Sequence, residues 1–200
     1  MAVNHDPIVK RCRALDISPA VLGYDNKKSK RAPGGTMRRR KLSEYGVQLR
    51  EKQKLKFIYG VLERQFSNYY EMAAKMDGIT GENLITLLES RLDNVVFRMG
   101  MARTRREARQ LVVHSHFRLN GKKANIPSML VKVGDVISVK DSSKKSEMIK
   151  SLIDSLDPKY VPAWLTLDAE NATATVTELP KKEHLDYPIE EHLIVELYSK

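Results

Sequence analysis

The chain has 200 residues, of which 42% are hydrophobic, so it can bury a core and form one or two domains. It contains no run of about 18 apolar residues that could span a membrane, and its start lacks the apolar segment of a secretory signal. Its single cysteine, Cys12, excludes an internal disulfide and fits a reducing compartment.

The net charge of +10 predicts an anionic partner, and this charge is unevenly distributed. Residues 1–60 carry 15 Lys and Arg against 5 Asp and Glu, and residues 91–150 carry 14 against 5. Residues 61–90 and 151–200 are acidic, with 2 against 5 and 4 against 10. This alternation predicts two separate surfaces that face an anion, whereas the acidic blocks could face basic neighbours or protein partners.

The N-terminal segment shows no sustained hydrophobic period, and Pro33-Gly34-Gly35 interrupts regular structure. It ends in a run of four cations, Arg38, Arg39, Arg40 and Lys41. A basic stretch with few apolar anchors is typical of an arm that becomes ordered on its partner. We predict that residues 1–42 form an extended basic arm, with a disordered solubilising tail as the alternative.

Helical signals begin at Ser43, which is a good N-cap residue. Apolar residues then recur at spacings of three and four between Leu55 and Met76, although Gly60 can bend or split the segment. Near the C-terminus, apolar residues of a closing helix recur every four positions, and we expect this helix to pack against the first one.

A second apolar stripe runs from Leu84 to Met99 and predicts another helix. Arg91, Asn94 and Arg98 fall on a neighbouring polar stripe of that helix. We therefore expect Arg91 and Arg98 to reach outward while the apolar residues pack inward.

The next helix begins with Thr104 and Glu107, which match a T-x-x-E capping box. Four arginines surround this helix start: Arg103, Arg105, Arg106 and Arg109. Acidic residues are the usual preference at that end, because the helix dipole is positive there. Free backbone N–H groups and arginine side chains suit a phosphate, so the arrangement predicts an anion-binding helix start.

Strand signals follow this helix. Asn120-Gly121 between two short β-prone runs predicts a hairpin with a type I′ turn, and Lys122 and Lys123 at its tip could extend the basic surface. Further short strands are expected around Gly134, and residues 164–167 and 173–177 are expected to pair.

These elements predict an α+β fold. A helical domain of residues 43–90, completed by residues 180–200, would carry an inserted α/β domain of residues 91–179. The inserted domain would hold two short helices and a small, mostly antiparallel sheet.

Sequence signatures of catalysis are lacking: we find no phosphate-binding loop, no G-x-G-x-x-G and no G-x-S-x-G. His114 and His116 could share a strand face, but no third metal ligand stands near them. Asp93 is best explained as an ion-pair partner that orients Arg91. We predict no enzymatic activity, no metal and no cofactor.

The stretch RLDNVVFRMGMARTRREARQLVVHSHFRLNG resembles the S-four RNA-binding module, which we place at residues 91–150. RNA-modifying enzymes, a group of tyrosine-tRNA ligases and heat-shock RNA binders share this module. The flanks LSEYGVQLREKQKLKFIYGVLERQFSNYY, TGENLITLLESRLDNVV and EHLIVELYSK decide between them. They resemble the bacterial S-four family of small-subunit ribosomal proteins, and the likeness runs from about Lys10 to the last residue.

The resemblance implies a primary 16S rRNA-binding protein in the cytoplasmic ribosome that nucleates assembly of the subunit body. It implies contact with ribosomal protein S-five, with an influence on translational accuracy, and proximity to ribosomal protein S-three where messenger RNA enters. Some members also repress their own mRNA, which is an alternative or second role here. An RNA-modifying enzyme is a further alternative, but a catalytic domain is lacking.

The proposed RNA face combines the patterns above with this resemblance, and it comprises Arg38, Arg39, Arg40, Lys41, Ser43, Tyr45, Arg50, Lys54, Arg91, Arg103, Thr104, Arg105, Arg106, Arg109, Lys122 and Lys123. Many members carry a four-cysteine zinc knuckle near the N-terminus, of which only Cys12 remains here. The chain therefore looks like a zinc-free variant. Its arm must be ordered by RNA, or by packing of residues such as Ile17, Val21 and Leu22.

Overall fold

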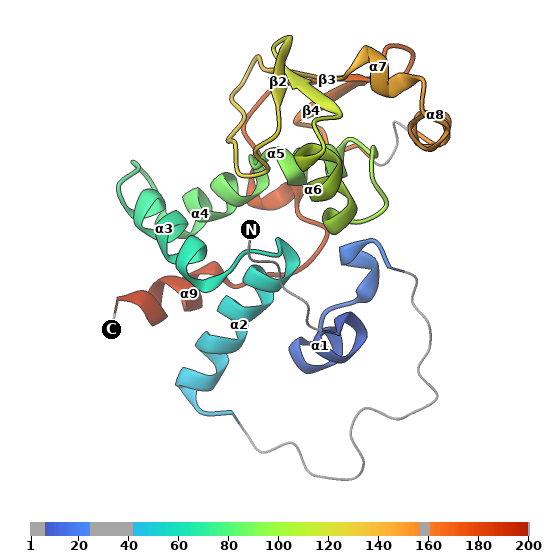
Figure 1. The fold of residues 1–200 in the computed structure, drawn as a ribbon. Helices are drawn as coiled ribbons and strands as arrows, with labels where there is room; N and C mark the ends of the chain where they lie inside the picture. The colour runs from blue at the N-terminus through green and yellow to red at the C-terminus, as the bar shows by residue number, and fades with distance from the viewer. Residues whose placement is uncertain (1–6, 25–41, 157–160, 200) are drawn as a thin grey trace. The chain divides into compact units, whose positions relative to one another are not determined.

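The computed structural model describes residues 7–24, 42–156 and 161–199 (Figure 1). The chain divides into two compact units, Met1–Asn83 with Asp186–Lys200, and Leu84–Leu185. The range 91–179 that we predicted for an inserted domain lies inside the second unit, and its insertion into a helical domain remains our proposal. The four predicted cations Arg38, Arg39, Arg40 and Lys41 lie outside the described residues.

The first unit is built from helices. Its elements are α1 (Ile8–Leu15), the 3-10 turn η1 (Pro19–Leu22), α2 (Glu44–Ile58), α3 (Glu63–Ala74) and α9 (Glu191–Tyr198). Gly60 separates α2 from α3 with a φ of 62°, a conformation that glycine adopts at low cost. The long helical segment predicted from Ser43 is therefore two helices, divided at the glycine that the sequence marked.

Helices α2 and α9 pack against each other in this unit, which confirms the predicted partnership of the closing helix. Leu55, Phe66 and Ile194 have no exposed surface. The hydroxyl of Tyr187 donates to the hydroxyl of Tyr59 at 2.8 Å, which fixes the chain just before α9. Burial of each large apolar side chain stabilises the unit by about 1.5–3 kcal/mol.

Part of the segment expected as an extended arm is folded. Helix α1 buries Cys12 and Leu15, and the guanidinium of Arg11 donates to Gln53 Oε1 of α2 at 3.2 Å. Ile17 and Leu22 are also buried. Of the two ways to order this segment without zinc, packing therefore accounts for residues 7–24.

The second unit combines helices with one sheet. Its helices are α5 (Leu92–Arg98), α6 (Arg105–Val113), α7 (Asp141–Lys144) and α8 (Glu147–Asp154), and α4 (Thr80–Glu89) runs into it from the first unit. The strands are β1 (Phe117–Leu119), β2 (Lys122–Ala124), β3 (Val136–Val139), β4 (Leu165–Asp168) and β5 (Thr173–Val176). They form an antiparallel sheet in the order β2-β1-β3-β5-β4, which confirms the predicted α+β fold.

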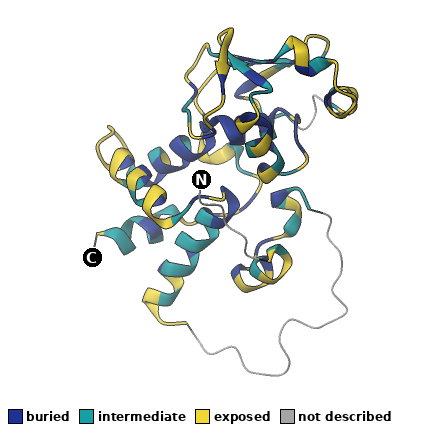
Figure 2. Cartoon of the chain, in the orientation of Figure 1, coloured by how far each residue is buried: buried dark blue, intermediate teal, exposed yellow. Residues whose placement is uncertain are grey.

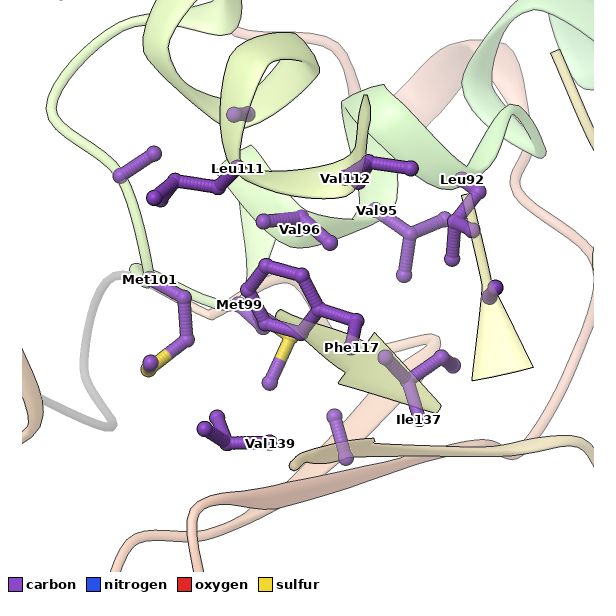
Figure 3. Close-up of a cluster of buried hydrophobic side chains, with 14 of the residues drawn as sticks. Leu92, Val95, Val96, Met99, Met101, Leu111, Val112, Phe117, Ile137 and Val139 are labelled. Atoms are coloured by element: carbon purple, nitrogen blue, oxygen red, sulfur yellow. The ribbon is translucent and has the colours of Figure 1, made fainter. Parts of the chain in front are cut away.

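Helices α5 and α6 cover one face of this sheet (Figure 3). Val96 and Leu111 of the helices pack into the same cluster as Phe117, Ile137 and Val139 of the strands. Almost all of α5 is buried (Figure 2). The helices and the apolar side of the sheet thus form one core, which holds the start of α6 in place.

The β1–β2 hairpin has the predicted turn. Asn120 and Gly121 both have positive φ angles, 51° and 75°, as a type I′ turn requires. The side chain of Asn120 also accepts from the backbone N–H of Val136 at 2.9 Å and donates to Asp135 at 2.7 Å. The turn is therefore fixed to the start of β3.

Candidate nucleic-acid interface

Helix α6 begins with a side-chain cap, as predicted. The hydroxyl of Thr104 accepts from the backbone N–H of Glu107 at 3.1 Å. Glu107 Oε2 in turn accepts from the backbone N–H of Arg103 at 2.8 Å, one residue earlier than a standard capping box. The loop before α6 is thereby fixed together with the first turn of the helix.

The apolar stripe from Leu84 to Met99, which predicted one helix, is divided between two helices, α4 and α5. The backbone N–H of Val131 donates to Ser90 O at 2.9 Å, and that of Leu92 donates to Met129 O at 2.8 Å. These bonds to a distant loop hold Arg91 in extended geometry at the N-cap position of α5.

Arg91 is consequently buried, with 2% of its surface exposed. Its Nε and Nη2 donate to the two carboxylate oxygens of Asp93 at 3.0 and 2.7 Å. The predicted pairing with Asp93 is confirmed, but the prediction that Arg91 reaches outward is wrong. Arg109 approaches the same carboxylate from α6, at 3.5 Å.

A second buried cluster surrounds Glu89. Arg98 donates through Nε and Nη2 to the two Glu89 oxygens at 3.0 and 2.9 Å, so this arginine does not reach outward either. Asn94 Nδ2 donates to Glu89 Oε2 at 2.7 Å. The carboxylate therefore joins the end of α4 to α5.

Arg105 belongs to this second cluster. Its Nε donates to Asn94 Oδ1 at 2.8 Å, and its guanidinium lies 4.3 Å from the ring centre of Phe97. Only 7% of its surface is exposed. Asn94 and Phe97 of α5 hold the side chain inside, and RNA binding by Arg105 stays a proposal.

The cations that remain at the surface near the start of α6 are Arg103 and Arg106, which are exposed, and Arg109, which is partly buried. Their positive charge lies where the helix dipole is also positive. A phosphate there would accept hydrogen bonds from guanidinium groups in paired geometry. The buried arginines hold the frame, and the exposed ones lie at the surface beside the helix start.

Lys122 and Lys123 are both exposed but lie on opposite faces of the sheet, because side chains alternate along a strand. Lys122 pairs with Leu119, and Lys123 pairs with Arg118. Leu119 packs against the core, so Lys122 shares the face that α5 and α6 cover. The hairpin therefore does not extend a single basic surface with both lysines.

The candidates in the first unit lie at the start and middle of α2. Ser43 caps the helix by accepting from the backbone N–H of Gly46 at 3.2 Å, and Tyr45 is 58% exposed. Arg50 Nη2 lies 3.7 Å from Asp16 Oδ2, and Lys54 Nζ lies 2.6 Å from Glu51 Oε1. RNA binding by these four residues stays a proposal.

Glu89 and Asn94 were missed as members of the site. One signal could have revealed Glu89, because an acidic residue in the last turn of a helix opposes the dipole and needs another partner. The sequence placed Asn94 on the polar stripe with Arg91 and Arg98, but that pattern could not show its hydrogen bond with Arg105 of the next helix.

No cluster of three or more side chains suited to a metal ion occurs among residues 7–24, 42–156 and 161–199. Over the same residues, none of the helices has the length and apolar character needed to cross a membrane.

The fold and the site define a basic α+β protein with a nucleic-acid-binding module. A family model described as Ribosomal protein S4/S9 N-terminal domain matches residues 4–89, and one described as S4 domain matches residues 90–137. Proteins named small ribosomal subunit protein uS4 from Agathobacter rectalis and Lachnospira eligens are 57% and 54% identical over 200 residues, the whole of both chains in each comparison. The one from Caldicellulosiruptor saccharolyticus is 60% identical over 162 residues, 81% of this chain and 78% of its own. The chain therefore belongs to the uS4 family of small-subunit ribosomal proteins, which is not an enzyme family.

Proposed function

We propose that this chain is a structural constituent of the small ribosomal subunit that binds 16S rRNA directly and nucleates assembly of the subunit body. The observation that carries the proposal is its similarity to uS4 proteins along the entire chain. The exposed Arg103 and Arg106 beside the capped start of α6 provide the chemistry. Its place of action would be the ribosome in the cytoplasm.

Binding would depend on phosphate contacts held by a rigid frame. Junctions in folded RNA bring phosphates close together, and clustered cations that neutralise them release counterions. Side chains cannot read bases in the deep groove of an A-form helix, so recognition would use shape, phosphates and 2′-hydroxyl groups. The ion pairs around Asp93 and Glu89 would fix the geometry of the α6 start before RNA arrives, which lowers the entropic cost of binding.

Protein neighbours would include ribosomal protein S-five, with which the chain would influence translational accuracy, and ribosomal protein S-three near the point where messenger RNA enters. The acidic residues 151–200, with 10 acidic against 4 basic side chains, suit a basic neighbour. The chain's own mRNA could also bind if it presents a similar folded junction.

Sedimentation of the native protein from a cell lysate tests this function. We expect it to travel with small ribosomal subunits and to be released by high salt, because the contacts are with phosphates. A protein that stays at the top of the gradient at low salt would contradict the assignment.

A further inference from the structure

The sheet of the second unit has a second face that α5 and α6 do not cover. Because side chains alternate, Arg118 of β1 lies on the side opposite to its buried neighbour Phe117. The strand register pairs Arg118 with Lys123 on one side and with Ser138 on the other. This row of polar side chains runs across the open face.

A hollow of about 220 Å³ lies along the hairpin at this face. It is lined by Ser115, Phe117, Arg118, Gly121, Lys123 and Lys140. Three of the six lining residues are cations and none is acidic, which is the composition of an anion site.

The cations of the hollow are placed unfavourably for a protein without a ligand. Arg118 and Lys123 stand directly opposite each other on neighbouring strands, and like charges in that position destabilise a sheet. The carboxylate of Asp141 is 3.9 Å from Arg118 but its side chain is 82% exposed, so it compensates weakly. Within the described residues, neither Lys123 nor Lys140 forms an ion pair.

His116 lies next to Lys140, whose backbone N–H donates to His116 O at 2.8 Å. The pKa of His116 is lowered by burial and then by the nearby charges of His114 and Lys140. Both effects disfavour the protonated form of the His116 imidazole.

Ser115 adds a strained backbone position at the edge of the hollow. Its φ is 61°, in the left-handed region, where it closes the C-terminus of α6. The backbone N–H groups of Ser115 and His116 donate to Val112 O and Leu111 O at 2.8 and 3.2 Å, in a motif that usually has glycine here. Ser115, which keeps this conformation, lines the hollow, and such strained positions gather at ligand sites.

We propose that this hollow binds a backbone phosphate of RNA on the face opposite to the one that α5 and α6 cover. Arg118 would donate paired hydrogen bonds to the phosphate, Lys123 and Lys140 would supply charge, and the Ser115 hydroxyl would donate one further bond. The inference rests on the proposed rRNA binding and adds a second contact, so that Lys122 and Lys123 face different RNA segments.

Binding of the full-length protein to a fragment of the 16S rRNA 5′ domain, measured over a range of salt concentrations, tests the hollow. The double variant Lys123→Gln with Lys140→Gln should bind at least about 10-fold more weakly at physiological salt, with a salt slope lower by about two. The matched control, Lys145→Gln with Lys150→Gln, removes the same charge from exposed positions away from the hollow and should change the slope less. Unfolding in urea checks that every variant is folded.

Two results would contradict phosphate binding in the hollow without contradicting the proposed rRNA binding. In the first, the Lys123→Gln with Lys140→Gln variant binds RNA with the affinity and salt slope of the wild type, whereas the Arg103→Gln with Arg106→Gln variant binds RNA more weakly. The other is saturable binding of inorganic phosphate by the protein, lost in the hollow variant without any loss of RNA affinity. If the wild-type protein itself does not bind the fragment, the proposed function fails instead.

A chemical cleavage probe attached at single cysteines tests the geometry. The protein's own Cys12 is buried, so Lys122→Cys and Lys123→Cys can each carry a tethered iron chelate. We expect the two probes to cleave different rRNA segments, and identical cleavage patterns would contradict two separate contacts.

Discussion

At the scale of single residues, Arg105 and Arg106 show that adjacent cations can have different environments. Arg105 is buried against Asn94 and Phe97, whereas Arg106 is exposed. Successive residues of a helix point in directions about 100° apart, so one arginine can support the helix start while the next contacts a ligand.

Replacement of the two arginines by alanine separates these roles. Arg105→Ala removes the hydrogen bond from Arg105 Nε to the buried Asn94 Oδ1. The loss should lower the free energy of unfolding by about 1–3 kcal/mol. Arg106→Ala should change that free energy by less than about 0.5 kcal/mol, while weakening RNA binding and reducing the salt slope by about one. Urea unfolding and filter binding measure the two effects, and equal destabilisation by both variants would contradict the assignment.

Glu89 provides a second test at this scale. The Glu89 side chain is 1% exposed and pairs with Arg98. Glu89→Gln would leave the buried charge of Arg98 uncompensated and should lower the free energy of unfolding by about 3–5 kcal/mol. Glu82→Gln on the same helix α4 is the control, because Glu82 is exposed. A Glu89→Gln protein that unfolds at the wild-type urea concentration would show that the buried network is not needed.

At the scale of elements, the cap of α6 connects stability to the candidate site. Thr104→Ala removes the acceptor of the Glu107 N–H and should destabilise the protein by about 1 kcal/mol. Thr104→Ser keeps the hydroxyl, so its free energy of unfolding should remain within a few tenths of a kcal/mol of the wild-type value. Thermal unfolding compares the two variants, and an equal effect of both would exclude the hydrogen bond as the cause.

The corner between α2 and α3 should make stability depend on pH. Burial raises the pKa of Glu63, but hydrogen bonds and charges from Lys52 and Lys56, 2.6 and 2.8 Å away, outweigh it and lower the pKa below its ordinary 4.5. Because the folded pKa lies below the unfolded one, this stabilisation is present above about pH 4.5 and is lost as the pH falls through the folded value. The side chain is half exposed, so the effect should be at most about 1 kcal/mol.

Glu63→Gln measures this contribution. At pH 7 the variant should be slightly less stable than the wild type, and the difference should shrink as the pH falls from 4.5 through the lowered folded pKa, where the native carboxylate becomes protonated. Urea unfolding at several pH values provides the measurement. A difference that is the same at pH 7 and pH 3 would rule out the ion pairs as its source.

Local elements of this fold could be predicted from the sequence, and long-range breaks could not. The Asn120-Gly121 turn and the Thr104 cap depend on residues within a few positions, so their patterns were sufficient. The end of α4 depends on hydrogen bonds from Leu92 to Met129 and from Val131 to Ser90, whose partners are 37 and 41 positions apart in the chain, and no helical period can contain such contacts.

At the scale of the whole molecule, the sequence located the basic regions but could not divide their cations into structural and exposed groups. Arg91 and Arg98 are buried because they form ion pairs with Asp93 and Glu89. The pair between Arg98 and Glu89 depends on how α4 and α5 pack together. The opposite faces of Lys122 and Lys123 follow from strand alternation, but only once the edges of the strand are known.

We propose above all that exposed cations on a rigid frame bind folded ribosomal RNA. The most direct measurement is the affinity of the full-length protein for the 16S rRNA 5′ domain and for a plain RNA duplex of equal length, over a range of salt concentrations. We predict tighter binding to the folded domain and a steep loss of affinity with salt, which becomes shallower in Arg103→Gln with Arg106→Gln. Equal affinity for both RNAs at every salt concentration, or a double variant that binds like the wild type, would contradict the account.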